Sequence, residues 1–296
     1  MLLISVNKMI KLPVTKEIKS LINLAVAEDL GTGDVTSSLT VPTGLKGTAR
    51  LVTREDITVC GMELVEAILK TYDSRLKLAT SIPDGGRAKK GQLLGTITGP
   101  MRPLLSAERV VLNFLQHLSG ISTATARYAK QAKGTRAFVY DTRKTTPGFR
   151  TIEKYAVLCG GGKNHRTGLY DAILIKDNHL ATFGPRLAAK LAELVEKAQK
   201  IKGLRFFEVE VDSLSQLEEV LKVKGVDIVL LDNFTPAQMK KAVKMRNSIK
   251  GKKPQLEASG GITLKNIKAV AQTGVERISV GAITHSAPAV DIGLDI

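Results

Sequence analysis

From residue 135 onward, short apolar runs alternate with stretches of helical periodicity, and this alternation restricts the fold more than any other feature. The apolar runs predict strands at 137–141, 171–175, 206–211, 227–232, 255–259 and 277–281. Helices are predicted at 150–159, 185–201, 213–223, 236–248 and 263–272. Strands that alternate with helices form parallel sheets with crossover helices. Because a closed barrel of this kind has about eight such units, the six found here predict an incomplete α/β barrel.

The first part of the chain follows a different pattern, in which glycine and proline turns separate short predicted strands. The strands are expected at 48–60, 76–82 and 92–98, and helices at 16–29 and 61–72. This mixture is typical of an α+β layer built on an antiparallel sheet. Ser106 is expected to cap a long helix that ends near Gly134.

The composition argues against disordered and membrane-spanning proteins. Hydrophobic residues are 43% of the 296 and charged residues 24%, as in globular proteins. No apolar run approaches the roughly 18 residues that cross a bilayer, and Asn7 and Lys8 interrupt the opening too soon for a signal peptide. The two cysteines, Cys60 and Cys159, favour a reducing cytoplasm over a disulfide framework.

The excess of positive charge indicates an anionic partner. The chain has 44 Lys and Arg against 28 Asp and Glu, a formal net charge of +16, most of it in residues 118–296. Aromatic residues are 4% and Trp is absent, and no nucleic-acid-binding module is recognisable, so a pocket for a small polyanion is favoured over a nucleic-acid surface. One basic run without acids is interpreted as the solvated face of a helix and its loop: Lys240, Lys241, Lys244, Arg246, Lys250, Lys252 and Lys253.

Each predicted strand of the second part ends in polar, charged or glycine residues. In α/β barrels the carboxyl ends of the strands form the face on which active sites are built. A single polar strand end could simply mark the approach to water, but six together indicate a site. The residues concerned are Asp141, Thr142, Arg143, Lys144, Lys176, Glu210, Asp232, Ser259, Gly260, Gly261 and Gly281.

Several of these side chains suit an anionic substrate. Arg143 can bind a carboxylate with two hydrogen bonds, while Lys144 supplies a mobile point charge. His165 and Arg166, in GGGKNHRTG, add further donors. The triple glycine 160–162 is not a Walker phosphate loop, because no Lys-Ser or Lys-Thr pair follows it.

Acidic and glycine-rich strand ends suit a metal ion and a phosphate. Glu210 and Asp232 are carboxylates of the kind that bind Mg²⁺ together with a phosphorylated substrate. Glu208 shares the strand parity of Glu210, so both are expected to face the barrel interior, with Glu210 nearer the mouth. The segments ASGGI and SVGAI resemble phosphate-binding loops of α/β barrels. No catalytic triad is evident, and Cys159 is interpreted as a packed helix residue.

The motifs together resemble those of the quinolinate phosphoribosyltransferase family. They are EDLGTGDVTS, ERVVLNFLQHLSGIST, the stretch 141–179, EVEVDSL, IVLLDNF and EASGGI followed by VERISVGAIT. The similarity runs in order along nearly the whole chain, and only about the first ten residues lie outside it.

This resemblance implies a fold, a reaction and an assembly. An N-terminal α/β sandwich domain is expected over residues 1–117 and an incomplete TIM-like α/β barrel over 118–285, with the tail 286–296 returning to the first domain. The implied reaction converts quinolinate and phosphoribosyl pyrophosphate to nicotinate mononucleotide, pyrophosphate and CO₂, with Mg²⁺. A homodimer or larger even oligomer is expected, with the active site at the subunit interface.

The resemblance also implies roles for single residues. Arg109 would reach the neighbouring subunit's site. Quinolinate would be held by Thr142, Arg143, His165, Arg166 and Lys176, although His165 could instead orient its neighbours. The expected catalytic residues, serving ribose, pyrophosphate and Mg²⁺, are Lys144, Glu210 and Asp232. The 5′-phosphate would lie on Ser259, Gly260, Gly261 and Gly281.

Three other functions are consistent with parts of this pattern. The nearest is a related enzyme of the same fold that uses nicotinate or another acceptor, such as the pyrophosphorylase-like proteins associated with molybdate transport. An inactive barrel that binds nucleic acid would show a steep salt dependence. An aldolase-type or flavin-type barrel is the third, and its Schiff-base candidate would be Lys176.

Overall fold

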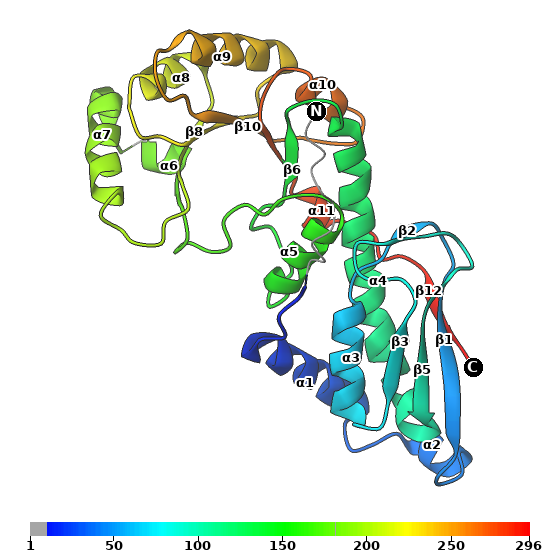
Figure 1. Cartoon of the computed structure of the whole chain (residues 1–296). Coiled ribbons are helices and arrows are strands. Elements are labelled where there is room, and N and C mark those ends of the chain that lie inside the picture. Colours follow the sequence, from blue (N-terminus) through cyan, green and yellow to red (C-terminus); the bar gives the residue numbers. More distant parts are fainter. Residues whose placement is uncertain (1–10, 181) are drawn as a thin grey trace. The chain divides into compact units, whose positions relative to one another are not determined.

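The computed structural model describes residues 11–180 and 182–296 (Figure 1). The first ten residues, where no signal peptide was expected, lie outside that range. The chain forms two compact units. The first ends at Ala126 and also contains Thr146–Gly161 and Ser286–Ile296, and the second contains Arg127–Thr145 and Gly162–His285. The units therefore divide nine residues beyond the expected boundary at residue 117, and the helix predicted at 150–159 lies in the first unit.

An antiparallel sheet forms the centre of the first unit, with the strand order β12-β1-β5-β3 (Figure 1). Its strands are β1 (Lys46–Thr53), β3 (Lys77–Thr80), β5 (Leu93–Pro100) and β12 (Ile292–Asp295). A separate short pair joins β2 (Ile57–Thr58) to β4 (Arg87–Ala88). The strands predicted at 76–82 and 92–98 are confirmed, whereas the one predicted at 48–60 is divided into β1 and β2, which belong to different sheets. β12 carried no sequence signal because a four-residue edge strand shows almost no alternation.

Side chains accept free N–H groups at the starts of α1 (Lys16–Leu30), α2 (Val35–Thr40) and α3 (Met62–Tyr72), three helices of the first unit. A further helix of this unit is α5 (Arg150–Cys159). Asp34 caps α2 by accepting from the N–H of Ser37 at 2.8 Å. Gly61 precedes α3 and has no side chain to cap it, so Asp84 accepts both the Gly61 and Met62 N–H groups, at 2.9 Å each.

The long helix α4 (Met101–Ala132) begins earlier than predicted. Ser106 is not its cap, because its hydroxyl donates to the carboxylate of Asp34 at 2.8 Å from inside the helix. Pro103 explains the difference, since proline at a helix start appears in a sequence as a break but is tolerated in the first turn. The prediction of the helix is confirmed, and that of its start is wrong.

The second unit is built on a parallel sheet with the strand order β6-β11-β10-β9-β8-β7. Its strands are β6 (Phe138–Tyr140), β7 (Ile173–Ile175), β8 (Phe207–Val211), β9 (Ile228–Asp232), β10 (Gln255–Ser259) and β11 (Arg277–Ser279). Within the described part of the chain, the edge strands β6 and β7 do not pair with each other, so the barrel stays open. This confirms the predicted incomplete α/β barrel, and it brings the carboxyl ends of six parallel strands to one face.

Helices follow the strands of this sheet. They are α6 (Asp177–Leu180), α7 (Leu187–Ala198), α8 (Leu214–Leu221), α9 (Pro236–Ser248), α10 (Ile267–Ala271) and α11 (Ala282–His285). Figure 1 shows α8 and α9 on the outer side of β8 and β10. Leu217 and Val220 of α8 are buried, as the amphipathic pattern predicts.

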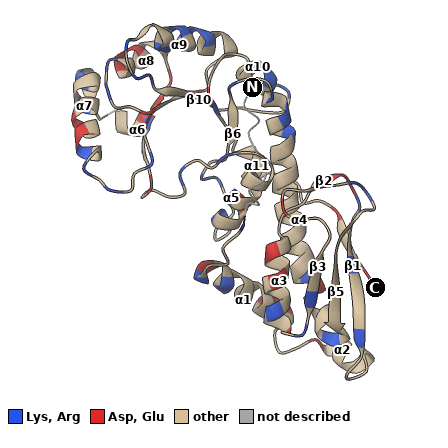
Figure 2. Ribbon diagram, in the orientation of Figure 1, with Lys and Arg blue, Asp and Glu red and all other residues tan. Residues whose placement is uncertain are grey.

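The basic run at 240–253 is exposed along α9 and the loop after it (Figure 2), with one exception. Arg246 is 5% exposed, and its guanidinium donates to the carbonyl of Pro254 and to the Glu276 carboxylate at 2.9–3.1 Å. The interpretation as a solvated face is therefore wrong for Arg246 and confirmed for the lysines. A charge run in a sequence does not reveal which member meets a carboxylate from a distant part of the chain.

Two further predictions concerned membrane-spanning segments and the state of the two cysteines. No described helix combines the length and the apolar character needed to span a bilayer. Cys60 and Cys159 are both buried with free thiols, and Cys159 ends α5 as a packed residue.

Candidate active site

A cavity of about 710 Å³ lies at the carboxyl ends of the strands of the second unit. Its lining includes every sequence-predicted site residue except Asp141 and Arg109. These are Thr142, Arg143, Lys144, His165, Arg166, Lys176, Glu210, Asp232, Ser259, Gly260, Gly261 and Gly281. The shared edge of a parallel sheet brings them together although they span 140 positions of sequence.

Two arginines form the most strongly cationic part of this cavity. Arg166 is 7% exposed, and its Nη1 donates to the Ala172 carbonyl at 3.3 Å. Its burial and the positive charge of Arg143 lower the pKa of Arg166. Like charges held close together in a poorly solvated site are unfavourable, so an anion placed beside them would be stabilised.

Asp141, directly after β6, joins the segment that carries Arg143 and Lys144 to the loop that carries His165 and Arg166. Its carboxylate is fully buried and accepts from the backbone N–H of His165 at 2.8 Å. The carbonyl of Lys144 accepts from the hydroxyl of Thr284 on α11 at 2.6 Å. Both segments are therefore attached to the sheet rather than free at its edge.

The acids of the cavity each accept a hydrogen bond from a neighbour. Glu210 Oε2 accepts from the ammonium of Lys176 at 3.2 Å, and Asp232 Oδ2 accepts from the Asn233 amide at 2.8 Å. The side chain of Lys176 is 47% exposed. An exposed, ion-paired ammonium is a poor Schiff-base nucleophile, since that chemistry needs a desolvated amine.

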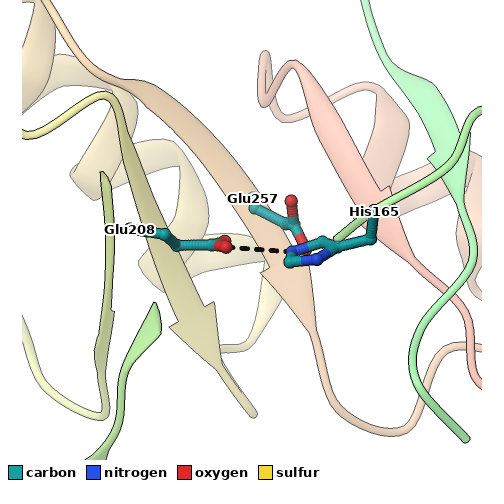
Figure 3. Close-up of side chains that lie close together, drawn as sticks. All are labelled: His165, Glu208 and Glu257. Carbon is teal, nitrogen blue, oxygen red and sulfur yellow. Dashed lines mark ion pairs between the residues drawn. The ribbon is translucent and has the colours of Figure 1, made fainter. Parts of the chain in front are cut away.

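A buried ionic cluster adjoins the cavity (Figure 3). His165, Glu208 and Glu257 point toward one another, His165 from a loop and the two acids from β8 and β10, which lie on either side of β9 in the sheet. His165 Nε2 lies 2.9 Å from Glu208 Oε2 and 3.4 Å from Glu257 Oε1. Glu257 also accepts from Arg277 and from Ser279 on β11. As the strand parity predicted, Glu208 faces the interior with no exposed surface, while Glu210 lines the cavity.

The cluster favours a positive charge on His165. Burial alone would lower the pKa of His165, but hydrogen bonds and charge interactions with Glu208 and Glu257 raise it to about 9. Burial and the charge of Glu257 raise the pKa of Glu208 to about 7. Burial would also raise the pKa of Glu257, but His165, Arg277 and Ser279 lower it to about 2.

His165, Glu208 and Glu257 also have the residue types of a metal site, with their ligand atoms within 4.8 Å of one another. The guanidinium of Arg277, which is 6% exposed, already occupies one side of the Glu257 carboxylate. A second, divalent cation there would face that buried positive charge. The arrangement is therefore an ion-pair network that supports His165.

Glycines form the side of the cavity at the ends of β10 and β11. Gly260 has φ +88°, and a Cβ added there would lie 2.1 Å from the side-chain oxygen of Asn233. A Cβ at Gly281 would lie 3.0 Å from Lys144 Cδ. Both positions therefore leave backbone close to neighbouring side chains, an arrangement that suits a phosphate group.

Five polar lining residues were missed from the sequence: Asn233, Glu257, Thr263, Ser279 and His285. Two of them had a usable signal, because Glu257 precedes Ser259, and Ser279 precedes Gly281, by two positions on a strand and so shares a face with it. His285, four residues after Gly281 at the end of α11, and Asn233 lacked a comparable signal.

Arg109 lies in the first unit and does not line this cavity. It lines a smaller hollow of about 280 Å³ with acidic neighbours that include Asp29, Asp34 and Glu108.

Comparison with known protein families identifies both parts of the chain. Residues 34–119 match the model of the quinolinate phosphoribosyl transferase N-terminal domain, and residues 121–295 match that of the C-terminal domain. Together the matched regions cover most of the chain.

Individual relatives agree with this match. The chain is 42% identical to nicotinate-nucleotide pyrophosphorylase (carboxylating) of Mycobacterium leprae, over 93% of this chain and 95% of that protein. It is 38% identical to the tobacco quinolinate phosphoribosyltransferase (decarboxylating) 1b, over 95% of this chain and 83% of that protein. The solved structure of the nicotinate-nucleotide pyrophosphorylase from Francisella tularensis superposes with a TM-score of 0.87 at 37% identity, covering 98% of this chain and 99% of that one.

Proposed function

This chain belongs to the quinolinate phosphoribosyltransferase family, and we propose that it catalyses the reaction for which that family is named. It joins quinolinate to the ribose of phosphoribosyl pyrophosphate and releases pyrophosphate and CO₂, giving nicotinate mononucleotide for NAD biosynthesis. One observation carries the proposal: a single cavity combines clustered cations, the acids Glu210 and Asp232, and glycine loops. These groups match a dicarboxylate, a metal-bound pyrophosphate and a phosphate, respectively.

The cationic part of the cavity binds the two carboxylates of quinolinate. Arg143 and Arg166 can each donate two parallel N–H groups to a carboxylate. Lys176 supplies a point charge, and His165 adds another when protonated. Thr142 contributes a hydroxyl donor at the edge of this group.

The opposite part of the cavity binds phosphoribosyl pyrophosphate. The backbone N–H groups of Ser259, Gly260, Gly261 and Gly281 receive the 5′-phosphate. Lys144 neutralises pyrophosphate charge as it develops on the leaving group, while Glu210 and Asp232 orient the ribose and stabilise the positive charge at its anomeric carbon.

The residues present fit a magnesium ion. Glu210 and Asp232 line the cavity beside the glycine loops, and Mg²⁺ is usually held by one or two carboxylates together with substrate phosphates. When bound, Mg²⁺ would neutralise the charge of the pyrophosphate group. The two carboxylates would hold it directly or through water.

The bond changes need no protein nucleophile. The pyridine nitrogen attacks the anomeric carbon, and the bond to pyrophosphate breaks. The ribosylated nitrogen is then positively charged, so the ring accepts the electron pair left when the adjacent carboxylate departs as CO₂. A proton then replaces that carboxylate on the ring carbon. The cavity contributes alignment and charge stabilisation.

The assembly and the cellular location form a second part of the proposal. The enzyme is a homodimer or a larger even oligomer in which Arg109 of one subunit completes the cavity of another. The exposed apolar side chains Val35 and Leu39 follow Asp34, which lines the same hollow as Arg109, and they are consistent with a covered surface. A cytoplasmic location fits the free, buried thiols of Cys60 and Cys159.

Carboxyl-labelled quinolinate tests the reaction directly. Purified protein is mixed with phosphoribosyl pyrophosphate, Mg²⁺ and either quinolinate or nicotinate, and released CO₂ and mononucleotide are measured. CO₂ release with quinolinate, and no mononucleotide from nicotinate, is expected. Product formed only from nicotinate would instead identify a related enzyme of the same fold, and steeply salt-dependent nucleic-acid binding without turnover would indicate the inactive-barrel alternative.

Substitutions locate the reaction in this cavity. Arg143→Ala and Lys176→Ala are each expected to lower kcat/KM for quinolinate by about 100-fold or more, since each removes a charged contact to substrate. Lys240→Ala, an exposed lysine of α9, is the control and should retain normal kinetics. Normal kinetics in either cavity variant would contradict the assigned site.

A further inference from the structure

Asn233 is the only non-glycine residue with positive φ in the described ranges 11–180 and 182–296. Its φ is +55°, in the left-handed region that most side chains avoid and that asparagine tolerates best. It directly follows Asp232 at the end of β9 and lines the cavity. An uncommon backbone conformation beside a functional carboxylate indicates that its geometry is held by surrounding contacts.

Two hydrogen bonds join Asn233 to the functional groups on either side of it. The side-chain Nδ2 donates to Asp232 Oδ2 at 2.8 Å, which restricts the rotation of that carboxylate. The backbone N–H donates to the carbonyl of Ser259 at 3.0 Å, which attaches the end of β9 to the start of the glycine loop.

The side-chain oxygen of Asn233 also restricts position 260 to glycine. A Cβ there would lie only 2.1 Å from Asn233 Oδ1 and 3.0 Å from its backbone nitrogen. Asn233 therefore packs directly against the bare backbone of the loop. A neutral amide makes this contact without adding negative charge beside a site for phosphates.

We propose that Asn233 is a positioning residue for phosphoribosyl pyrophosphate: its amide orients the Asp232 carboxylate and sets the position of the Gly260 loop. This inference rests on the function proposed above and assigns a role to a residue outside the predicted site. Its contacts lie at Asp232, Ser259 and Gly260 rather than at the arginines that face the dicarboxylate. Loss of the amide should therefore weaken the binding of phosphoribosyl pyrophosphate and not that of quinolinate.

Two substitutions separate the amide from the backbone conformation. Asn233→Gly keeps the positive φ without strain and removes the side chain. Asn233→Asp keeps the shape but replaces the N–H donor with an oxygen facing Asp232. The control is Asn247→Asp on α9, an exposed asparagine whose oxygen accepts from Arg246 and can do so as a carboxylate.

Steady-state kinetics and ligand-induced stabilisation provide two readouts. Asn233→Gly is expected to raise KM for phosphoribosyl pyrophosphate about 5- to 20-fold, consistent with one lost hydrogen bond to a charged group, while KM for quinolinate stays within about twofold. Asn233→Asp should raise KM for phosphoribosyl pyrophosphate further, because a second carboxylate repels the phosphates. In both variants, phosphoribosyl pyrophosphate with Mg²⁺ should raise Tm less than it does in the unsubstituted protein.

The outcomes distinguish this inference from the proposed function. No CO₂ release by the unsubstituted protein would refute the function itself. An active unsubstituted enzyme with an unchanged KM for phosphoribosyl pyrophosphate in Asn233→Gly would overturn the positioning role. Equal increases in both KM values, or a lower Tm without ligand, would also overturn it, because they would show general loosening of the cavity.

Discussion

Asp171 offers a quantitative test of how the cationic loop is held. Its carboxylate accepts from the backbone N–H groups of Thr167 and Gly168 at 2.8–3.0 Å. The guanidinium of Arg205 lies 3.2 Å from the same carboxylate and also donates to the His165 carbonyl at 3.3 Å. Replacing Asp171 by Asn removes the negative charge and one of the two accepting oxygens. The loop that follows Arg166 should then be less stable.

The pKa of Asp171 determines the expected magnitude. Burial alone would raise this pKa, but the two N–H groups and Arg205 lower it to about 2 from a usual 3.8. One pKa unit corresponds to about 1.4 kcal/mol, so the ionised carboxylate contributes about 2 kcal/mol to folding. This contribution is complete above the unfolded pKa of about 4 and is lost as pH falls through about 2.

Guanidinium unfolding followed by circular dichroism at several pH values measures this contribution. Asp171→Asn should lower the free energy of unfolding by about 2 kcal/mol between pH 5 and pH 8, and the deficit should shrink below about pH 4. The control is Asp212→Asn, an exposed carboxylate, which should change stability by less than about 0.5 kcal/mol. A deficit for Asp171→Asn as small as that of the control, or one that stays constant below pH 4, would refute the reasoning.

Three further predictions concern buried groups. Glu257→Gln should lower unfolding free energy by about 3 kcal/mol, since it leaves the buried Arg277 without its carboxylate; a change below about 1 kcal/mol in denaturant titration would contradict this. Gly120→Ala places a Cβ 2.2 Å from the Pro288 carbonyl oxygen. It should therefore lower the free energy of unfolding by about 2 kcal/mol and lower Tm, and an unchanged Tm would disprove the contact. Tyr155→Phe removes the 2.8 Å bond to Asp84 and should cost about 1 kcal/mol; unfolding at an unchanged denaturant midpoint would argue against it.

Most of the candidate site was predictable because it depends on one topological rule. Residues at the carboxyl ends of parallel strands meet at one edge, so locating the strands was sufficient to group Arg143, Lys176, Glu210 and Asp232. The charges of these side chains then indicated a site that binds an anionic substrate and a metal cation.

Other features could not be read from local pattern. The burial of Arg246, the β12 pairing and the approach of Glu208 and Glu257 to His165 each depend on a partner distant in sequence. Strand parity placed Glu208 inside the barrel, but it did not show that a loop residue, His165, would supply the opposing charge.

The sequence by itself determined the fold class, the strand ends and the residue types at the cavity, because hydrophobic periodicity and chain order are local properties. Tertiary structure alone decided the charge balance around His165 and the left-handed conformation of Asn233 against Gly260. Both depend on distances of a few ångströms between elements, and those distances exist only once the sheet has assembled.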